Sequence, residues 1–159
     1  MNLTNLRETL ALQAFGLLKI PMILFVSPRV VDFSDARIEV CVPLRRRTRN
    51  HLKSMYFGAL AVGADCACGL LAMRLINARK DKKISLVFKD MSAQFLKRPE
   101  GDMHFVCDQG EQIRDLVERA ATTGERCNLP LNITAFVPKI SASDPVATFV
   151  LTLSLKARA

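Results

Sequence analysis

The sequence predicts an α+β fold in which an antiparallel sheet of about five or six strands wraps around one long apolar helix. Three observations lead to this prediction. The chain has 159 residues, the usual size of one domain. Residues 54–73 form a run of 20 residues whose only charged side chain is Asp65. Several other segments alternate between apolar and polar residues, as half-buried strands do. Because we find no repeat and no flexible linker, we predict a single domain over residues 1–159.

The elements before the apolar run are a helix and a strand. Leu3, Leu6, Leu10, Ala14 and Leu17 recur at helical spacing, so we expect an amphipathic helix over about residues 3–18. Residues 22–26, bracketed by two prolines, are expected to be extended or looped. Residues 37–44 alternate cleanly and predict the first strand.

The central helix is expected over about residues 53–79, and four further strands follow it. Alternation predicts strands within residues 84–95, with an irregularity, and from residue 103 to 107. A second amphipathic helix is expected over residues 110–122 and is ended by Gly124. The last two strands are predicted at residues 131–137 and 147–155.

The length of the apolar run also fits a membrane-spanning helix. Against this alternative, an Asp near the centre of such a helix costs about 2.5–3.5 kcal/mol on the insertion scale. The apolar face of the predicted sheet must also pack against another apolar element, and this helix is suited to that role. We therefore predict a buried core helix and no membrane span.

The formal charge is +8, and the basic residues are clustered. Such clusters attract polyanions, among them nucleic acid, anionic membranes and phosphorylated cofactors, although a solvated basic rim without a partner explains them equally well. No zinc-finger spacing or aromatic RNA-binding signature is present, so we do not expect nucleic acid as a partner. The clusters comprise Arg45, Arg46, Arg47 and Arg49; Arg79, Lys80, Lys82 and Lys83; and Lys97 and Arg98.

The five cysteines show no metal-binding spacing, so no metal site is predicted. Most of them lie in apolar runs, where a reduced Cys behaves as a small hydrophobic residue. Together with the absence of a secretion signal at the N-terminus, this pattern favours a reducing cytoplasm.

Asp65 is the candidate functional residue, because a buried carboxylate is unfavourable unless it is paired. It shares a helical stripe with Gly58, Ala61, Gly69 and Ala72, whose small side chains leave room beside the carboxylate. Three alternatives remain open: Asp65 caps a backbone segment, it pairs with an Arg, or the small residues allow close packing of another element.

The start of the central helix offers a second set of candidate groups. Backbone N–H groups around Tyr56, Phe57 and Gly58 lack partners within the helix and favour negative charge. Such donors can stabilise the oxyanion formed during acyl transfer. His51 adds little to this prediction, and His104 is expected to be a surface or hydrogen-bonded histidine.

The segment Asn50-His51-Leu52-Lys53-Ser54-Met55-Tyr56-Phe57-Gly58-Ala59-Leu60, followed by Ala64-Asp65, resembles the central-helix signature of hot-dog fold thioesterases of the PaaI-like group. It is most similar to a poorly characterised bacterial branch of that group. The signature has an Asn, a His-Gly-Gly at the helix start and an Asp seven residues after the last Gly. Asn50, Gly58 and Asp65 fall on matching positions without a gap, and the order of elements over residues 37–158 fits as well.

The resemblance implies a hot-dog domain that pairs into a homodimer, or a dimer of dimers, with active sites at the subunit interface. The implied reaction is hydrolysis of a fatty or aromatic acyl-CoA. Asp65 would be the general base or nucleophile, the N–H groups of Phe57 and Gly58 would form the oxyanion hole, and Asn50 would orient water or the thioester carbonyl. Coenzyme A would be part of the substrate, and no separate cofactor is expected.

Substrate-binding residues are also implied by the resemblance. Ser85 lies where some relatives have a polar catalytic helper, and the basic residues Arg79, Lys82 and Lys83 would suit the phosphates of coenzyme A. Tyr56, expected to border the substrate, forms with Phe57 a bulky pair where the family often has His-Gly.

That replacement leaves a second function open, namely a non-catalytic acyl-CoA or lipid-binding protein. A dehydratase ranks lower, because neither His51 nor His104 matches the His that such enzymes pair with the carboxylate.

Overall fold

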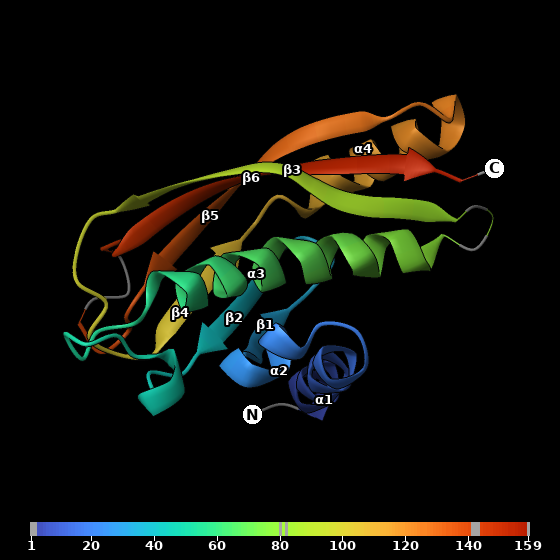
Figure 1. The fold of residues 1–159 in the computed structure, drawn as a ribbon. Coiled ribbons are helices and arrows are strands. Elements are labelled where there is room, and N and C mark those ends of the chain that lie inside the picture. Colours follow the sequence, from blue (N-terminus) through green and yellow to red (C-terminus); the bar gives the residue numbers. More distant parts are fainter. Residues whose placement is uncertain (1–2, 80, 82, 141–143, 159) are drawn as a thin grey trace.

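The computed structural model describes residues 3–79, 81, 83–140 and 144–158, and these form a six-stranded antiparallel sheet around a central helix (Figure 1). The strand order in the sheet is β1-β2-β4-β5-β6-β3. The predicted α+β architecture is thereby confirmed. The elements are α1 (Leu3–Leu18), α2 (Pro21–Val26), β1 (Arg29–Phe33), β2 (Ile38–Val42), the short 3-10 helix η1 (Arg46–Thr48), α3 (Phe57–Ala78), β3 (Ile84–Phe95), β4 (Met103–Cys107), α4 (Gly110–Thr123), β5 (Cys127–Phe136) and β6 (Ala147–Ala157).

Helix α3 runs along one face of the sheet and supplies the centre of the core (Figure 1). Ala64 and Leu71 of α3 are fully buried, as is Phe105 of β4, and Phe149 of β6 is almost fully buried. Although α3 is long and apolar enough to cross a membrane, 61% of its most apolar stretch is buried inside the fold. The prediction of a core helix is therefore confirmed.

The central helix begins at Phe57, four residues later than predicted. The preceding residues form a tight loop in which the Asn50 N–H donates to the carbonyl of Ser54 at 2.8 Å. Lys53 adopts a positive φ of 65°, which is incompatible with a right-handed helix. The sequence before Phe57 has no residue whose side chain caps the helix. For this reason, the sequence pattern did not show where the loop ends and the helix begins.

Two elements before the central helix differ from the prediction. Residues 22–26, expected to be extended or looped, lie in the short helix α2 (Pro21–Val26), which Pro21 begins. Strand β1 was missed, because Arg29–Phe33 lacks clean alternation and has only one buried residue, Val30. The five strands of the element-by-element prediction thus become six.

The helix predicted at residues 3–18 is present, but its apolar face was assigned to the wrong side. Thr9, Leu12 and Gly16 are buried, whereas Leu10 and Leu17 are exposed. Two contacts explain this orientation. The N–H of Val30 donates to Oγ1 of Thr9 at 2.9 Å, and Gly16 lies so close to α2 that an added Cβ would be 2.7 Å from the backbone nitrogen of Leu24.

One edge strand of the sheet is covered by a helix, and the other is exposed. At the β1 edge, α1 covers the strand through hydrogen bonds such as the one from the Asn5 side chain to the carbonyl of Val31. At the other edge, β3 pairs only with β6 among the described strands, and its second half is exposed. The predicted irregularity in β3 is a register shift between Phe88 and Met91.

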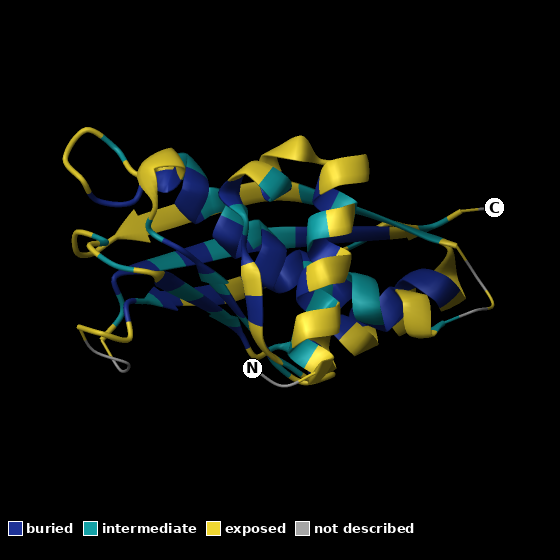
Figure 2. Ribbon diagram, turned by 90° about the horizontal axis from the view of Figure 1, so that it is seen from below, coloured by how far each residue is buried: buried dark blue, intermediate teal, exposed yellow. Residues whose placement is uncertain are grey.

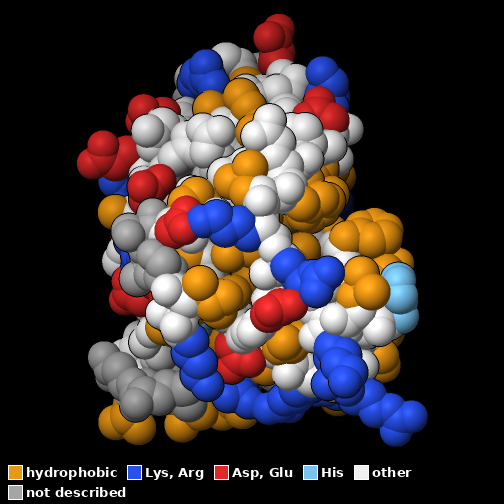
Figure 3. Space-filling view, turned by 90° about the vertical axis from the view of Figure 1, so that its left-hand side faces the viewer, with side chains coloured by type: hydrophobic (Ala, Val, Ile, Leu, Met, Phe, Trp, Pro, Cys, Tyr) orange, Lys and Arg blue, Asp and Glu red, His pale blue; other side chains and the backbone are white. Residues whose placement is uncertain are grey.

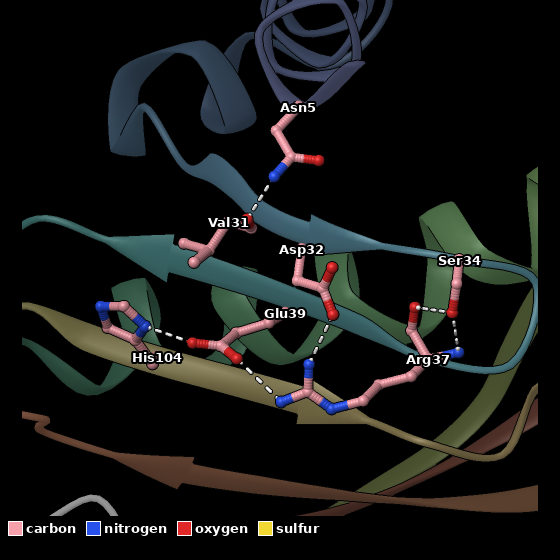
Figure 4. A network of polar contacts seen from close by, with 7 residues as sticks. All are labelled: Asn5, Val31, Asp32, Ser34, Arg37, Glu39 and His104. Atoms are coloured by element: carbon pink, nitrogen blue, oxygen red, sulfur yellow. Dashed lines mark hydrogen bonds and ion pairs between the residues drawn. The ribbon is translucent and has the colours of Figure 1, made fainter. Parts of the chain in front are cut away.

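A polar network lies on the sheet surface that faces away from α3 (Figure 4). Nδ1 of His104 is 2.7 Å from Oε1 of Glu39, and Arg37 donates to the carboxylates of Glu39 and Asp32, each at 2.8 Å. The prediction that His104 is a hydrogen-bonded histidine is confirmed. Burial raises the pKa of the Glu39 carboxyl, but hydrogen bonds from His104 and Arg37 outweigh burial and hold that pKa below its ordinary value.

Candidate active site

Asp65 lies in the third turn of α3, at the junction of two hollows. The larger hollow is a cavity of about 420 Å³ enclosed by α1, α2, α3 and β3, with Leu12, Ile23, Met73 and Phe88 in its lining. The second, of about 390 Å³, lies between α3 and the open edge of the sheet. Asp65 and Phe88 line both hollows. A molecule bound at Asp65 can therefore extend in two directions, and both have mainly apolar walls.

The Asp65 carboxylate has no hydrogen bond or ion pair with any described residue. The alternatives of a backbone cap and of an Arg partner are therefore wrong within the described chain. Burial raises the pKa of the Asp65 carboxyl above its ordinary value. An unpaired, half-buried carboxylate at a cavity is a suitable proton acceptor near neutral pH.

Of the predicted stripe of small residues, two members lie beside the hollows around Asp65. An added Cβ at Gly69 would be 3.5 Å from Oδ1 of Asp65 and 3.8 Å from the ring of Phe88. Ala61 lines the second hollow, whereas Ala72 is buried in the core. Gly69 therefore keeps the space next to the carboxylate open.

The loop before α3 is organised by Asn50. Oδ1 of Asn50 accepts hydrogen bonds from the N–H of Leu52 at 2.9 Å and from the N–H and hydroxyl of Ser54, both at 3.2 Å. The Asn50 side chain thus has a structural task in this loop, and its amide NH₂ group is left to act as a donor.

The N–H groups of Phe57 and Gly58 have no described acceptor. The N–H of Tyr56 donates to the carbonyl of Thr48, and helical bonding begins only at Ala59 and Leu60, whose N–H groups donate to the Tyr56 carbonyl. The two free donors stand at the positive end of a 22-residue helix. Of the three N–H groups expected to be free, that of Tyr56 is paired, and the binding of an oxyanion by those of Phe57 and Gly58 stays a prediction.

The ring of Tyr56 covers one side of Gly58. An added Cβ on Gly58 would lie 2.6 Å from Cε1 of Tyr56, and the Tyr56 and Phe57 rings are in contact with centroids 4.7 Å apart. Both rings are exposed. The bulky pair therefore narrows the approach to the helix N-terminus from one side without burying its donors.

Ser85 and the basic residues lie at the opposite end of α3 from the free N–H groups. Ser85 donates from its hydroxyl to the carbonyl of Lys156 at 3.0 Å and lines a separate hollow with Lys83 and Arg158, apart from Asp65. Arg79 is already paired with Asp81 at 2.9 Å and with Glu118. Lys83 and Arg158 have no described ion pair, and Lys82 lies outside the described residues.

Sequence reasoning missed the contribution of the N-terminal helices to the site. Leu12 and Phe15 of α1 and Ile20 and Ile23 near α2 form one wall of the larger cavity. Only their apolar character marks these residues, and it does not distinguish a cavity wall from ordinary core. Among the described residues, no group of three or more His, Cys, Asp or Glu side chains could hold a metal ion.

Residues 9–143 match the model of a domain of unknown function, DUF4442. The chain belongs to the DUF4442 family. No curated protein matches it.

Solved structures share the fold of this DUF4442 chain over nearly its whole length. A protein of unknown function from Pseudomonas aeruginosa, PA5026, described as a probable thioesterase, has 22% identity and a TM-score of 0.77, with 95% of this chain and 96% of that chain covered. A protein of unknown function from Chlorobaculum tepidum has 13% identity and a TM-score of 0.80, with 97% of both chains covered. The thioesterase HI1161 from Haemophilus influenzae has 14% identity and a TM-score of 0.66, with 99% of this chain and 92% of that chain covered.

These likenesses confirm the predicted fold. The DUF4442 chain has the α+β hot-dog architecture of the thioesterases that it resembled in sequence. The narrower placement in the PaaI-like group stays a prediction.

Proposed function

We propose that this protein hydrolyses the thioester of an acyl-CoA with Asp65 as the general base or nucleophile. The observation that carries this proposal is the unpaired Asp65 carboxylate at the point where two apolar hollows meet. The fold shared with thioesterases supports the same reaction class, and the site residues themselves support the chemistry.

As a general base, Asp65 would take a proton from water while the water oxygen bonds to the thioester carbonyl carbon. The carbonyl oxygen would become negative and would accept hydrogen bonds from the free N–H groups of Phe57 and Gly58. Collapse of this intermediate breaks the C–S bond, and the thiolate takes up the proton held by Asp65. The products are a carboxylic acid and coenzyme A, and no further cofactor is needed.

This chemistry requires a second copy of the chain. Gly58 and Asp65 are seven residues apart on one helix, which separates them by about 10 Å along its axis. One carbonyl group cannot contact both sites across that distance. In a dimer, Asp65 of one protomer can face the N–H groups at the start of the partner's central helix, so that one carbonyl group contacts both.

The open edge of β3 supports the pairing of two protomers. This strand has 12 residues, its outer backbone groups lack a described partner strand, and the exposed side chains Val87, Met91 and Phe95 lie along it. A long apolar edge of this kind favours pairing with another strand. We therefore infer a homodimer joined along β3, next to Asp65 and Phe88.

The acyl group of the substrate is expected to be apolar, because hydrophobic side chains line both hollows that meet at Asp65. Lys83 and Arg158 lie beyond the far end of the larger cavity and suit the phosphates of coenzyme A. A phosphate bound there would place the arm of coenzyme A in the larger cavity and the acyl group in the smaller one.

The test is thiol release from short, medium, long and aromatic acyl-CoAs by the wild type and by Asp65→Asn. Asp115→Asn, an exposed Asp on α4 without a described ion pair, is the matched control. We expect release by the wild type and the control, and a loss of about 10²–10⁴-fold in Asp65→Asn. Equal activity in Asp65→Asn would refute the assignment.

A non-catalytic acyl-CoA-binding protein is the second candidate, favoured by the Tyr56 ring that covers Gly58. It predicts a higher melting temperature with acyl-CoA but no release of coenzyme A. Tyr56→Gly separates the two functions, because opening the helix N-terminus would create or increase hydrolysis only if the ring obstructs it.

A further inference from the structure

The N-terminal helices turn apolar side chains outward in a way that the proposed hydrolysis does not explain. Eight of the 17 exposed large hydrophobic residues of the described chain lie within residues 3–25. Leu10 is 60% exposed and Leu17 is 65% exposed. Contiguous apolar patches of this kind mark interaction sites.

Helices α1 and α2 pack together on the underside of the molecule (Figure 1). Leu3, Leu10 and Leu17 are spaced by seven residues and so share one face of α1, which is about 24 Å long. Met22 and Phe25 of α2 are exposed beside it. Seen from below, both helices present exposed stretches to the viewer (Figure 2). We name Leu3, Leu6, Leu10, Leu17, Met22 and Phe25 the underside patch.

Cations without described ion pairs border the underside patch. Arg7 and Lys19 come from α1 and the residue after it, and Arg46 and Arg47 come from η1. The guanidinium carbon of Arg47 lies 6.0 Å from the centre of the Phe25 ring, which joins this basic group to the patch. Figure 3 shows Lys and Arg side chains in a band along the lower edge of the molecule, next to hydrophobic ones.

The acidic side chains nearest to this surface in the sequence, among residues 3–39, are all in ion pairs. Glu8 is the only acidic residue among residues 3–31, and it forms an ion pair with Arg74 of α3 at 3.8 Å. The next three acidic residues, Asp32, Asp35 and Glu39, are paired with Arg37 or Arg74. The underside patch therefore combines exposed apolar side chains with cations that have no described ion pair.

We propose that the underside patch and its bordering cations dock this protein onto the surface of an anionic lipid bilayer. A helix that exposes leucines between cations lies in the membrane interface, with its apolar face among the acyl chains and its cations at the headgroups. Each Lys or Arg near an anionic surface adds to the attraction. A second copy of the same cationic surface would be repelled instead, so charge complementarity favours lipid.

The docked surface is also the outer side of the cavity wall. Leu12 and Phe15 face the larger cavity from α1, while Leu10 and Leu17 face outward from the same helix. Docking therefore places the cavity one helix away from the lipid.

The test is co-sedimentation of the full chain with vesicles of phosphatidylcholine alone and of phosphatidylcholine mixed with phosphatidylglycerol. We expect binding to the mixed vesicles only, with a loss at high salt. Leu10→Ser with Leu17→Ser, and separately Arg46→Glu with Arg47→Glu, should each weaken binding about tenfold or more. These side chains are exposed, so the variants should keep the wild-type melting temperature.

Matched control variants distinguish binding through the underside patch from effects of net charge or exposed hydrophobicity elsewhere on the protein. Arg114→Glu with Arg119→Glu on α4 lowers the net charge by the same amount, and Ile140→Ser removes another exposed hydrophobic residue. Both should bind like the wild type. Absence of binding to the mixed vesicles, or equal loss in the controls, would overturn the proposal. A change in the oligomer mass of the leucine variant in solution would assign the patch to a second copy and overturn it as well.

Discussion

The carboxylate of Asp65 lies beside the bare backbone of Gly69, where an added Cβ would be 3.5 Å from Oδ1. That distance is an ordinary van der Waals contact, so a methyl group fits, whereas a longer side chain would occupy part of the hollow that Gly69 and Asp65 line. The ring of Phe88 closes the other side at 3.8 Å. A side chain at position 69 would therefore take up space next to the carboxylate.

A size series at Gly69 tests whether substrate uses this space. Gly69→Ala should retain most thiol release, because its methyl group meets its neighbours at normal contact distance. Gly69→Leu should lower kcat/KM about tenfold or more by displacing substrate from Asp65. Circular dichroism checks that both variants fold. Full activity in Gly69→Leu would place the substrate elsewhere.

The raised pKa of Asp65 predicts opposite pH effects on activity and stability. A general base acts when deprotonated, so kcat/KM should fall as pH drops through the raised pKa, at a pH above the ordinary Asp value of 3.8. Because the folded-state pKa lies above the unfolded value, stability declines as pH rises between the two values and stays lower above them.

Asp65→Asn removes this destabilising charge. At neutral pH its melting temperature should exceed that of the wild type, by about 2–4 °C for each kcal/mol gained. The gain should vanish at a pH below the ordinary Asp value, where the wild-type carboxyl is protonated. A lower melting temperature at neutral pH would indicate that Asp65 has a stabilising partner.

The sequence predicted the parts of this structure that depend on local pattern. Strand alternation located β2, β4 and β6, and the run around Asp65 located α3. The sequence pattern did not predict features that depend on contacts between elements distant in the chain. The leucines of α1 face outward because Thr9 and Gly16 fit β1 and α2 better, a preference that no periodicity reveals. The cavity wall formed by Leu12 and Ile23 was missed for the same reason. An apolar residue has the same pattern in the sequence whether it lines a cavity or packs in the core.

Lys83 provides a test of coenzyme A recognition. Lys83→Glu places a negative charge in the hollow that it shares with Ser85 and Arg158, so KM for acyl-CoA should rise while kcat changes little. Hydrolysis of an acyl-pantetheine, which lacks the nucleotide phosphates, should be unaffected. An equal effect on both substrates would show that Lys83 does not bind phosphate.

Two glycines of α3 should respond differently to replacement by Ala. An added Cβ at Gly63 would lie 2.4 Å from the buried ring of Phe105, which cannot move aside, so Gly63→Ala should destabilise the fold by about 1–3 kcal/mol. At Gly58 the obstructing atom belongs to the exposed Tyr56 ring, which can rotate away. Urea unfolding of both variants checks this, and equal destabilisation would contradict the packing described for Phe105.

The network around Glu39 should make the fold sensitive to acid. Hydrogen bonds from His104 and Arg37 lower the pKa of Glu39 below its ordinary value of 4.5, so its stabilising contribution is present above that value and is lost as pH falls through the lower folded-state pKa. Glu39→Gln should therefore unfold at a lower urea concentration at neutral pH and should lose less stability on acidification. Glu125→Gln, an exposed Glu without a described ion pair, is the control and should follow the wild-type pH profile. If Glu39→Gln kept the full pH dependence, the acid sensitivity would have to come from another carboxylate, and the hydrogen bonds from Arg37 and His104 to Glu39 would then not be what stabilises this face of the sheet.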